Sequence, residues 1–294
     1  MKSGFVAVIG RPNVGKSTLV NAILGAKLSI VTDKSQTTRN NIKGIYTKDD
    51  VQIVFVDTPG IHKPFQKLGE EMNSMAYSSS KDVDAVILVV DAGQNFGKGD
   101  EFVIEHVNVK VPLFIVFNKI DTTNILKITA LKDKYKELYP NATVVETVAT
   151  EKVNIDDLLN AIINILPEGP MYYPEDQLSD RDMRFQVKEI IREKTLKLLS
   201  AEVPHCLAVE IDSYKEGKKE IEIHASIIVE KDSQKGIVIG KGGQMIKRIG
   251  IQARRDIEKL EDCHVILNLY VKVEPDWRNK NSLLKQLGYS KTSN

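Results

Sequence analysis

The sequence predicts an α/β protein in which a doubly wound domain, built on a parallel sheet, is followed by a smaller α+β domain. Between residues 5 and 166, short β-rich runs alternate with longer segments of helical periodicity, which is the order of repeated βαβ units. The stretch PEGPMYYPED, with three prolines and a glycine, then interrupts the pattern and indicates a linker. Behind it, the expected elements change to helix, two strands, two helices and a strand. At 294 residues the chain is long enough for two domains with separate cores.

The strands of the first domain are expected at residues 5–9, 51–57, 85–91, 113–118 and 143–148. The runs at 85–91 and 113–118 are continuously apolar, as in strands that are covered on both faces. The run at 51–57 alternates in part, which favours a place nearer an edge of the sheet. A helix over 155–166, ended by Pro167, is expected to close the domain.

The second domain is expected to begin with a helix over residues 179–200. Two strands, at 206–214 and 220–230, follow around the turn KEGKK, and the sequence GKGG then separates two helical segments before a last strand. The tail after Pro275 is polar, and we expect it to be partly disordered except around Trp277. The expected domains are therefore 1–168 and 179–275, with a linker at 169–178 and a carboxy-terminal tail at 276–294.

Composition excludes several classes of protein. The longest apolar run has six residues, far short of the roughly 20 that a membrane-spanning helix needs, and the amino terminus leaves no room for a signal peptide. We therefore expect a cytosolic protein. Cys206 and Cys263 lack the spacing of a metal site and are expected to be core thiols. Residues 1–166 carry 19 basic and 19 acidic side chains, so bulk charge predicts no polyanionic partner for this part.

A phosphate-binding loop is predicted at residues 10–17, where GRPNVGKS has the GxxxxGKS spacing between an expected strand and a helix at 16–24. The glycines allow backbone amides to wrap around phosphates, and the helix amino terminus adds positive potential. We expect Lys16 to reach the β and γ phosphates and the Ser17 hydroxyl to ligate Mg²⁺. The other residues of this region expected to contact the nucleotide are Gly10, Asn13, Val14, Gly15 and Thr18.

A sensor for the γ-phosphate is predicted around DTPG. Asp57 ends an apolar strand, where its carboxylate can hold Mg²⁺ through water, while the Gly60 amide can meet the γ-phosphate. The polar stretch QTTRNN lies upstream and is long enough to fold over the phosphates. One of its threonines is expected to complete the Mg²⁺ coordination, and we favour Thr38 over Thr37, although such a run also suits an ordinary edge or loop. Lys16, Thr38 and Gly60 are the expected catalytic residues.

The sequence NKID predicts selection of guanine. It comprises Asn118, Lys119 and Asp121 at the end of another strand, where the Asp121 carboxylate could accept hydrogen bonds from N1 and the exocyclic N2 of guanine. Adenine offers neither donor in that arrangement, and such a site can discriminate by factors of roughly 10⁴. Alone, NKID would also suit a solvated loop, but its place behind the phosphate-binding loop favours a GTP site.

The GKGG sequence and its surroundings predict an RNA contact. Without side chains, Gly240, Gly242 and Gly243 would let a sugar-phosphate backbone approach the peptide. Seven basic residues and one acidic residue lie between positions 231 and 255, a pattern that a solvated helix face could also show. The order of elements resembles a type II KH fold, whose groove takes roughly four unpaired nucleotides. The expected RNA-binding residues are Ile239, Gly240, Lys241, Gly242, Gly243, Lys247 and Arg248, with Ile246 and Ile249 as further apolar walls.

Taken in order, GRPNVGKS, QTTR, DTPG and NKID resemble the translation-factor-related GTPases, and with the GKGG module behind them nearly the whole chain resembles the Era family. The resemblance implies a P-loop GTPase with a KH domain that binds the 3′ end of 16S rRNA on the 30S subunit and acts in small-subunit assembly. It also implies peripheral contact with the inner face of the cell membrane. We expect a monomer.

The chain departs from the family pattern at two places. A fifth motif, usually Ser-Ala, contacts the guanine through its backbone, and here Val148 and Ala149 occupy it, so we expect base binding with lower affinity. Ile61 stands where many GTPases carry a glutamine that orients the attacking water. It is either the mark of a subgroup with slow turnover or a simple core contact, and both predict slow hydrolysis. Asn13 matches a position linked to K⁺ binding in that subgroup.

Two other functions suit parts of the pattern. A P-loop kinase or ATPase would share the first motif, but NKID opposes it, and competition between ATP and GTP distinguishes the two. A scaffold for a protein or a membrane surface would use nucleotide as a regulator and GKGG as a structural turn. Salt-sensitive binding of single-stranded RNA would exclude the scaffold.

Overall fold

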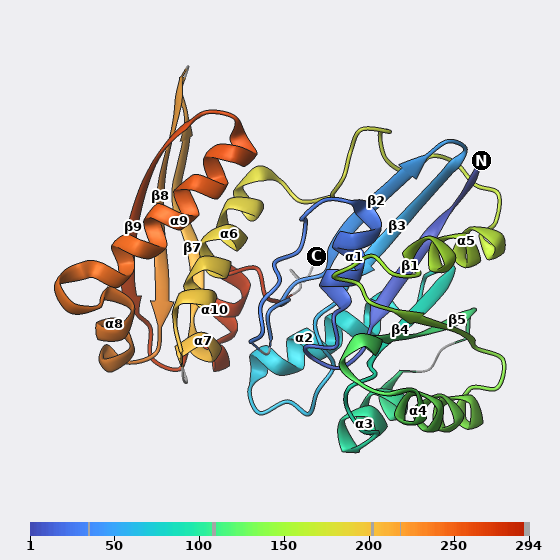
Figure 1. Ribbon diagram of the computed structural model, residues 1–294. Coiled ribbons are helices and arrows are strands. Elements are labelled where there is room, and N and C mark those ends of the chain that lie inside the picture. Colours follow the sequence, from blue (N-terminus) through green and yellow to red (C-terminus); the bar gives the residue numbers. More distant parts are fainter. Residues whose placement is uncertain (35, 108–109, 201–202, 218, 291–294) are drawn as a thin grey trace. The chain divides into compact units, whose positions relative to one another are not determined.

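The computed structural model describes residues 1–34, 36–107, 110–200, 203–217 and 219–290. The chain divides into two compact units, the first within residues 1–180 apart from segments 32–35 and 66–68, and the second from Arg181 onward (Figure 1). Each unit has its own sheet. Among the described residues, no helix combines the length and the apolar character needed to cross a membrane.

The first unit contains a six-stranded sheet with the order β2-β3-β1-β4-β5-β6. All neighbours pair in parallel except β2, which is antiparallel to β3. The strands are β1 (Lys2–Ile9), β2 (Ile42–Lys48), β3 (Val51–Asp57), β4 (Ala85–Asp91), β5 (Leu113–Asn118) and β6 (Thr143–Thr147). The apolar runs predicted to be interior strands, β4 and β5, are buried along their whole length. The prediction that these two strands are covered on both faces is therefore confirmed, and both are interior strands of the sheet.

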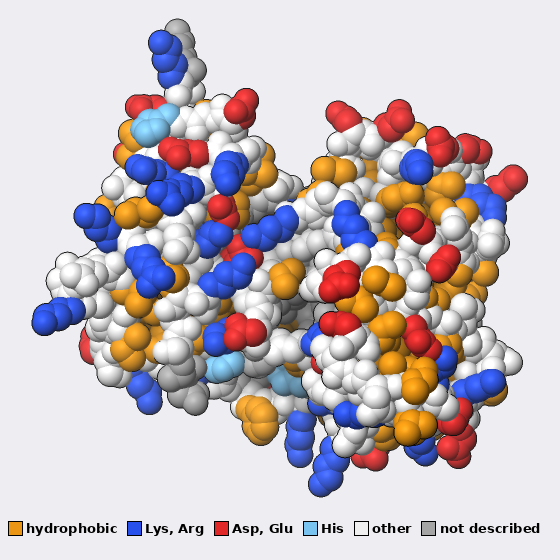
Figure 2. Space-filling model, in the orientation of Figure 1, with side chains coloured by type: hydrophobic (Ala, Val, Ile, Leu, Met, Phe, Trp, Pro, Cys, Tyr) orange, Lys and Arg blue, Asp and Glu red, His pale blue; other side chains and the backbone are white. Residues whose placement is uncertain are grey.

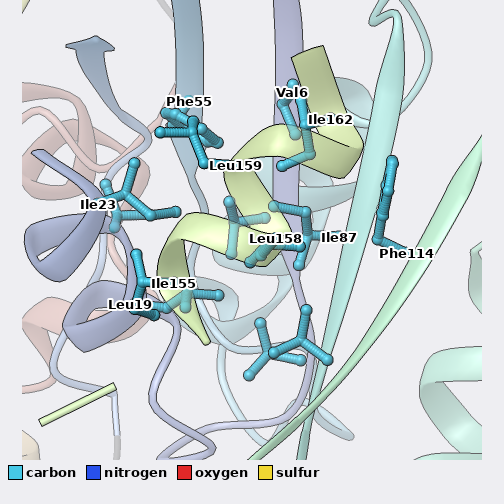
Figure 3. Packing of buried hydrophobic residues seen from close by; sticks show 14 of the residues in the cluster. Val6, Leu19, Ile23, Phe55, Ile87, Phe114, Ile155, Leu158, Leu159 and Ile162 are labelled. Atoms are coloured by element: carbon cyan, nitrogen blue, oxygen red, sulfur yellow. The ribbon is translucent and has the colours of Figure 1, made fainter. Parts of the chain in front are cut away.

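Helices cover both faces of this sheet. They are α1 (Lys16–Leu24), α2 (Lys67–Ser79), α3 (Lys98–His106), α4 (Ile125–Leu138) and α5 (Ile155–Ile165). On one face, Leu19 of α1 and Leu158 and Ile162 of α5 pack against β-strand side chains such as Ile87 (Figure 3). On the other face, α2, α3 and α4 contribute to a second cluster. Burial of each large aliphatic side chain stabilises the fold by about 1.5–3 kcal/mol, so these two layers fix the strand ends that carry the polar motifs.

Strand β2 was not predicted. Its sequence, IKGIYTK, has a glycine at its third position and lysines at its second and last positions, which lowers β propensity. Gly44 lets β2 pack closely against α1, because a Cβ there would lie 2.5 Å from Leu24 Cδ1 and would force this side chain to shift. The presence of β2 also explains why β3, expected near an edge, is the second strand of the sheet and almost wholly buried.

The stretch after α5 lies along the β2–β3 pair and is held there by hydrogen bonds. The fully buried Gln52 side chain donates to Tyr173 O (2.8 Å) and accepts from Tyr172 N (2.7 Å). Further along, Ile45 N donates to Leu178 O (2.9 Å), and Ser179 forms an isolated bridge with Gly44. The residues predicted to be a linker are thus fastened to the edge of the sheet.

The second unit has a three-stranded sheet with the order β7-β8-β9. Strands β7 (Ala208–Glu216) and β8 (Glu220–Val229) are antiparallel, and β8 and β9 (His264–Val273) are parallel. The helices are α6 (Met183–Leu198), α7 (Val203–Cys206), α8 (Asp232–Ile239) and α9 (Gln244–Glu261). This is the predicted order of elements with the short α7 added; residue 218 of the turn KEGKK lies outside the described residues. Helix α6 begins later than predicted because residues 178–180 bond to β2 and Asp182 supplies the N-cap to Phe185 N (2.8 Å).

The prediction of a separate, partly disordered tail from residue 276 is wrong as far as residue 289. Trp277 is fully buried and donates from Nε1 to Cys206 O (2.8 Å). The helix α10 (Asn281–Gln286) follows, and Leu284 and Tyr289 are also fully buried. These side chains belong to the second unit, because apolar burial outweighs the polar character of the intervening residues. Residues 291–294 of the predicted tail lie outside the described residues.

Candidate functional site

The loop between β1 and α1 has a backbone that only its glycines allow. Gly10 and Gly15 have φ values of 145° and 100°. A Cβ at Gly10 would lie 2.5 Å from Val89 O, and one at Gly15 would lie 2.2 Å from Asn118 Nδ2. The N-cap of α1, which begins at Lys16, is Gly15, which has no side chain that could cap the first turn. A helix end whose N-cap leaves the first amides uncapped favours binding of an anion.

Lys16 is buried within this loop, with 6 % of its surface exposed. Its ammonium group donates to Gly10 O (3.2 Å) and Arg11 O (2.8 Å). Burial lowers the pKa of Lys16 from 10.5 to about 8, and the negative charge of Asp57 opposes this shift in part. A buried cation whose ammonium group donates to two carbonyls would gain stability from an anionic ligand such as a phosphate.

Three predicted metal-binding residues converge beside the loop. Ser17 Oγ lies 2.7 Å from Thr38 Oγ1 and donates to Asp57 Oδ2 (2.7 Å). Asp57 is fully buried, and its Oδ1 has no hydrogen-bond partner among the described residues. Burial raises the pKa of Asp57, while the Ser17 and Ser29 hydroxyls and Lys16 lower it in part. A buried carboxylate with an unpaired oxygen beside two hydroxyls is a set of hard oxygen ligands that fits Mg²⁺.

The structure distinguishes the two candidate threonines. Thr38 is buried and contacts Ser17, whereas Thr37 is half-exposed. The described residues contain no group of three His, Cys, Asp or Glu side chains that could hold a metal by themselves. An ion at Ser17, Thr38 and Asp57 would therefore need further oxygens, which the phosphates of a nucleotide supply.

The DTPG turn lies directly against the phosphate-binding loop. A Cβ at Gly60 would lie 2.7 Å from Pro12 N, and Ile61 N donates to Gly10 O (3.0 Å). Ile61 is fully buried and belongs to the core cluster that α2, α3 and α4 share with the sheet. Of the two interpretations of Ile61, the core contact is therefore present, and this side chain cannot orient water.

Two residues of NKID donate hydrogen bonds to backbone carbonyls of the phosphate-binding loop. Asn118 is buried, donates to Val14 O (3.0 Å) and accepts from Ala149 N (3.0 Å), so its side chain joins the loop to the end of β6. Lys119 donates to Asn13 O (2.7 Å). Asp121 follows in a short 3₁₀ turn and is exposed, as a base-reading carboxylate must be.

The remaining residues predicted to contact the nucleotide differ in how far they are buried. Val14, Val148 and Ala149 are buried, and Thr18 is half-buried in the first turn of α1. The missing serine of the fifth motif leaves its backbone in place, because Ala149 N is fixed by Asn118. The sequence missed Thr147, whose hydroxyl donates to Asn118 Oδ1 (3.2 Å). It offered no signal there, since one threonine at a strand end is common.

In the second unit, the GKGG sequence forms the loop between α8 and α9. Gly240, Gly242 and Gly243 have φ values of 73°, 59° and 76°. A Cβ at Gly242 or Gly243 would meet no atom within 4 Å, so the outer surface of the loop is open, and Lys241 is exposed. This arrangement allows another backbone to approach closely.

A groove lies between α9 and β9, and its lining begins at Ile246 in the first turn of α9, which directly follows the loop. It has a volume of about 280 Å³ and is lined by Ile246, Lys247, Gly250, Ile251, Arg254, Leu267 and Leu269. Figure 2 shows Lys and Arg side chains spread over this unit with hydrophobic side chains between them.

The predicted RNA-binding residues are distributed unevenly around this groove. Lys247 and Ile246 line it, Arg248 is exposed, and Ile239 is half-buried without lining it. The prediction that Ile249 forms a wall is wrong, because this side chain faces the core and is fully buried. Helical spacing from Lys247 could have revealed Gly250, Ile251 and Arg254, which share its face of α9.

Comparisons with known proteins agree with both sites. A family model described as 50S ribosome-binding GTPase matches residues 5–119, and a KH domain model matches residues 202–278. A crystal structure of Era in complex with MgGDPNP and nucleotides 1506-1542 of 16S ribosomal RNA is 37 % identical and has a TM-score of 0.95, covering 99 % of this chain and 100 % of that one. This chain belongs to the Era family. A variant of Aquifex aeolicus Era bound to GDP·AlF4⁻ is also 37 % identical, with the same coverages and a TM-score of 0.94.

Membership of the Era family confirms the resemblance seen in the motifs. The protein is a GTPase with a doubly wound P-loop domain and a carboxy-terminal KH domain. The kinase and ATPase interpretations are thereby excluded. In this Era-family chain, the phosphate-binding loop, DTPG and NKID lie together at the carboxyl ends of β1, β3 and β5, where ligands of such sheets bind.

Truncation of Ile61 tests whether this residue takes part in hydrolysis. Ile61→Ala should lower the free energy of unfolding by about 2–5 kcal/mol, because the side chain is fully buried in the core. The rate of hydrolysis per folded molecule should change by less than about tenfold, since no water-orienting group is lost. Denaturant unfolding and single-turnover hydrolysis measure the two effects. A collapse of hydrolysis in fully folded protein would show that Ile61 acts in catalysis.

Proposed function

We propose that this Era-family GTPase binds single-stranded RNA in the groove of its KH domain and acts in assembly of the small ribosomal subunit. The observation that carries the proposal is the open GKGG loop at the head of a groove with apolar walls and basic rims. Lys241, Lys247 and Arg254 can contact phosphates, while Ile246 and Leu269 face the bases. The related Era structure with a 16S rRNA fragment supports the 3′ end of this RNA as the target.

We assign the nucleotide contacts as follows. Lys16 contacts the β and γ phosphates, the amide of Gly60 contacts the γ-phosphate, and Asp121 reads guanine. Ser17, Thr38 and Asp57 would hold Mg²⁺, which would supply charge neutralisation and alignment of the phosphates. The loop between α1 and β2 orders over the phosphates when GTP is bound, which makes the protein a switch. K⁺ beside Asn13 is a further proposal from the family resemblance, and equal hydrolysis rates in K⁺ and Na⁺ would count against it.

Replacement of the tip of the GKGG loop tests the RNA site. In a variant with Lys241→Asp and Gly242→Asp, affinity for an RNA oligonucleotide from the 3′ end of 16S rRNA should fall by roughly a hundredfold or more, because charge and bulk enter the path of the backbone. GTP binding should be unchanged. A matched control is Lys259→Asp with Leu260→Asp, which makes the same charge change at exposed positions of α9 outside the groove.

Fluorescence anisotropy at several salt concentrations measures both variants. Equal losses in the two would indicate that net charge alone, and not the groove, governs binding. If wild-type protein shows no salt-sensitive affinity for the RNA, the scaffold interpretation replaces this proposal. The same titrations in GTP-bound and GDP-bound protein test the switch, for which we expect affinities that differ by about 5–150-fold.

We also propose where in the cell the protein acts and which larger assemblies it contacts. The family resemblance supports a monomer in the cytoplasm that engages the 30S subunit and contacts the inner face of the cell membrane peripherally. Cell fractionation with sedimentation of ribosomal subunits tests these placements, and recovery in neither the 30S nor the membrane fraction would contradict them.

A further inference from the structure

We propose that residues 91–100, here called the bracket, fix the phosphate-binding loop from both sides and set the lifetime of the bound nucleotide. The bracket joins the end of β4 to the first turn of α3. It begins and ends with a carboxylate, and both Asp91 and Asp100 are nearly buried, with 7 % and 6 % of their surfaces exposed. Neither belongs to the motifs of the nucleotide site.

At its beginning, the bracket holds the loop through a lysine. Lys119 Nζ donates to Asp91 Oδ2 (2.8 Å) and to Asn13 O (2.7 Å), so it ties the carboxylate to the loop. Asp91 Oδ1 accepts from Gly93 N (2.9 Å), and Oδ2 also accepts from Gln94 Nε2 (3.2 Å). These two bonds fix the carboxylate so that Lys119 is held in one position. Asn13 has a left-handed backbone with φ of 63°, which a tether on its carbonyl helps to maintain.

At its end, the bracket holds the loop through an arginine. Arg11 Nη1 donates to Asp100 Oδ2 (2.8 Å), which also accepts from Gly97 N (3.0 Å). Asp100 Oδ1 accepts from the Tyr135 hydroxyl (3.1 Å) on α4. The guanidinium lies against the helix backbone, because a Cβ at Gly99 would be 2.6 Å from Arg11 Nε. Contacts with the start of α3 and with α4 thus hold the Asp100 carboxylate independently of its contact with the loop.

The two contacts act on both sides of Pro12. Arg11 and Asn13 are its neighbours, so the bracket holds the stretch of loop that must move if the phosphates are to leave. Arg11 O also accepts from Lys16 Nζ (2.8 Å), which links the tether to the phosphate-binding lysine. Arg11 and Lys119 side chains are 29 % and 37 % exposed, so solvent weakens each ion pair. We therefore assign each tether about a tenfold effect on nucleotide release, which corresponds to about 1.4 kcal/mol.

Release of a fluorescent GDP analogue from the full-length protein tests the bracket. Asp91→Asn and Asp100→Asn should each speed release about tenfold, and the double variant should speed release more than either single variant, because the two tethers act on different loop residues. In protein that already carries Lys119→Met, Asp91→Asn should not speed GDP release further, whereas Asp100→Asn should still speed it. Single-turnover hydrolysis at saturating GTP should stay within about threefold of wild type in the two aspartate variants, since neither carboxylate belongs to the proposed phosphate contacts.

Each carboxylate has a matched control that removes a partner outside the loop. Gln94→Ala removes one hydrogen bond to Asp91, and Tyr135→Phe removes one hydrogen bond to Asp100. Both variants keep the bonds of Asp91 to Lys119 and of Asp100 to Arg11. Because each carboxylate keeps its bond from a backbone amide, Gly93 N or Gly97 N, these controls should lower thermal stability and speed release by less than about twofold. The proposal is overturned if the aspartate variants release GDP within twofold of wild type, or if the controls speed release as much as the aspartate variants. Arg11→Gln provides a second test of the Asp100 tether should Asp100→Asn fail to fold.

Discussion

Replacing Lys16 with alanine is expected to reduce affinity for GTP and GDP by roughly a thousandfold or more, equivalent to about 4 kcal/mol. The ammonium of Lys16 is the buried cation at the head of the loop, and it would exchange its bonds with Gly10 O and Arg11 O for charge-assisted bonds with phosphate oxygens. Titration of fluorescent GTP and GDP analogues measures the loss. Lys2→Ala is a suitable control, because Lys2 Nζ also donates to a backbone carbonyl, that of Ile163 (2.8 Å), away from the site.

The buried charge of Lys16 should also lower the stability of the protein when no nucleotide is bound. Because the pKa of Lys16 is about 8 when folded and 10.5 when unfolded, the cost of burying its charge is fully present below pH 8 and disappears as the pH rises toward 10.5. Lys16→Met keeps the apolar stem and removes this charge. It should raise Tm by a few degrees at pH 7 and by less near pH 10. Unchanged nucleotide affinity in either Lys16 variant would disprove the assigned phosphate contact.

Asp121→Asn is expected to change the preferred base from guanine to xanthine. The amide offers a donor where the carboxylate offered only acceptors, so the N1 and N2 donors of guanine lose their partner while the O2 of xanthine gains one. Discrimination between the two bases can change by roughly 10⁴ at such a site. The exposed position of Asp121 in a 3₁₀ turn predicts that the fold is unaffected.

Competition of GTP and XTP against a fluorescent nucleotide measures the exchange. Asp133→Asn, at an exposed position of α4, is the matched control and should leave both affinities unchanged. If the Asp121 variant retains its selectivity for GTP and gains none for XTP, another residue must read the base.

Local sequence predicted much of this molecule because several signals depend on neighbouring residues alone. The helix over 16–24, the strands β3, β4 and β5, and the glycines of both loops were all placed correctly. These segments need a fixed periodicity or a backbone that glycine permits, and both are visible in a short window. The proximity of Ser17 and Asp57 also followed from the order of the motifs, since the carboxyl ends of the parallel strands β1 and β3 meet at one edge of the sheet. Thr38 was expected beside them because the polar stretch before β2 is long enough to fold over the phosphates.

The parts that could not be predicted depend on contacts between distant segments. Strand β2 exists because it pairs with β3 and because Gly44 leaves space for α1. Ile249 was assigned to the groove because apolar spacing on α9 does not show which side of the helix faces the sheet. Trp277 orders the end of the chain through a partner 71 positions away, a distance that no local pattern includes.

The fastening of residues 172–180 along the β2–β3 pair has a consequence for solubility. An outermost strand leaves a row of backbone donors and acceptors that can recruit a strand from another molecule and begin aggregation. Here Ile45 N is already bonded to Leu178 O, and Lys43 O accepts from Asp180 N (3.3 Å). Residues 178 and 180 thus already bond to backbone groups of β2 with which a strand from another molecule would pair. The segment that connects the two domains also shields β2 from pairing with other copies of the protein.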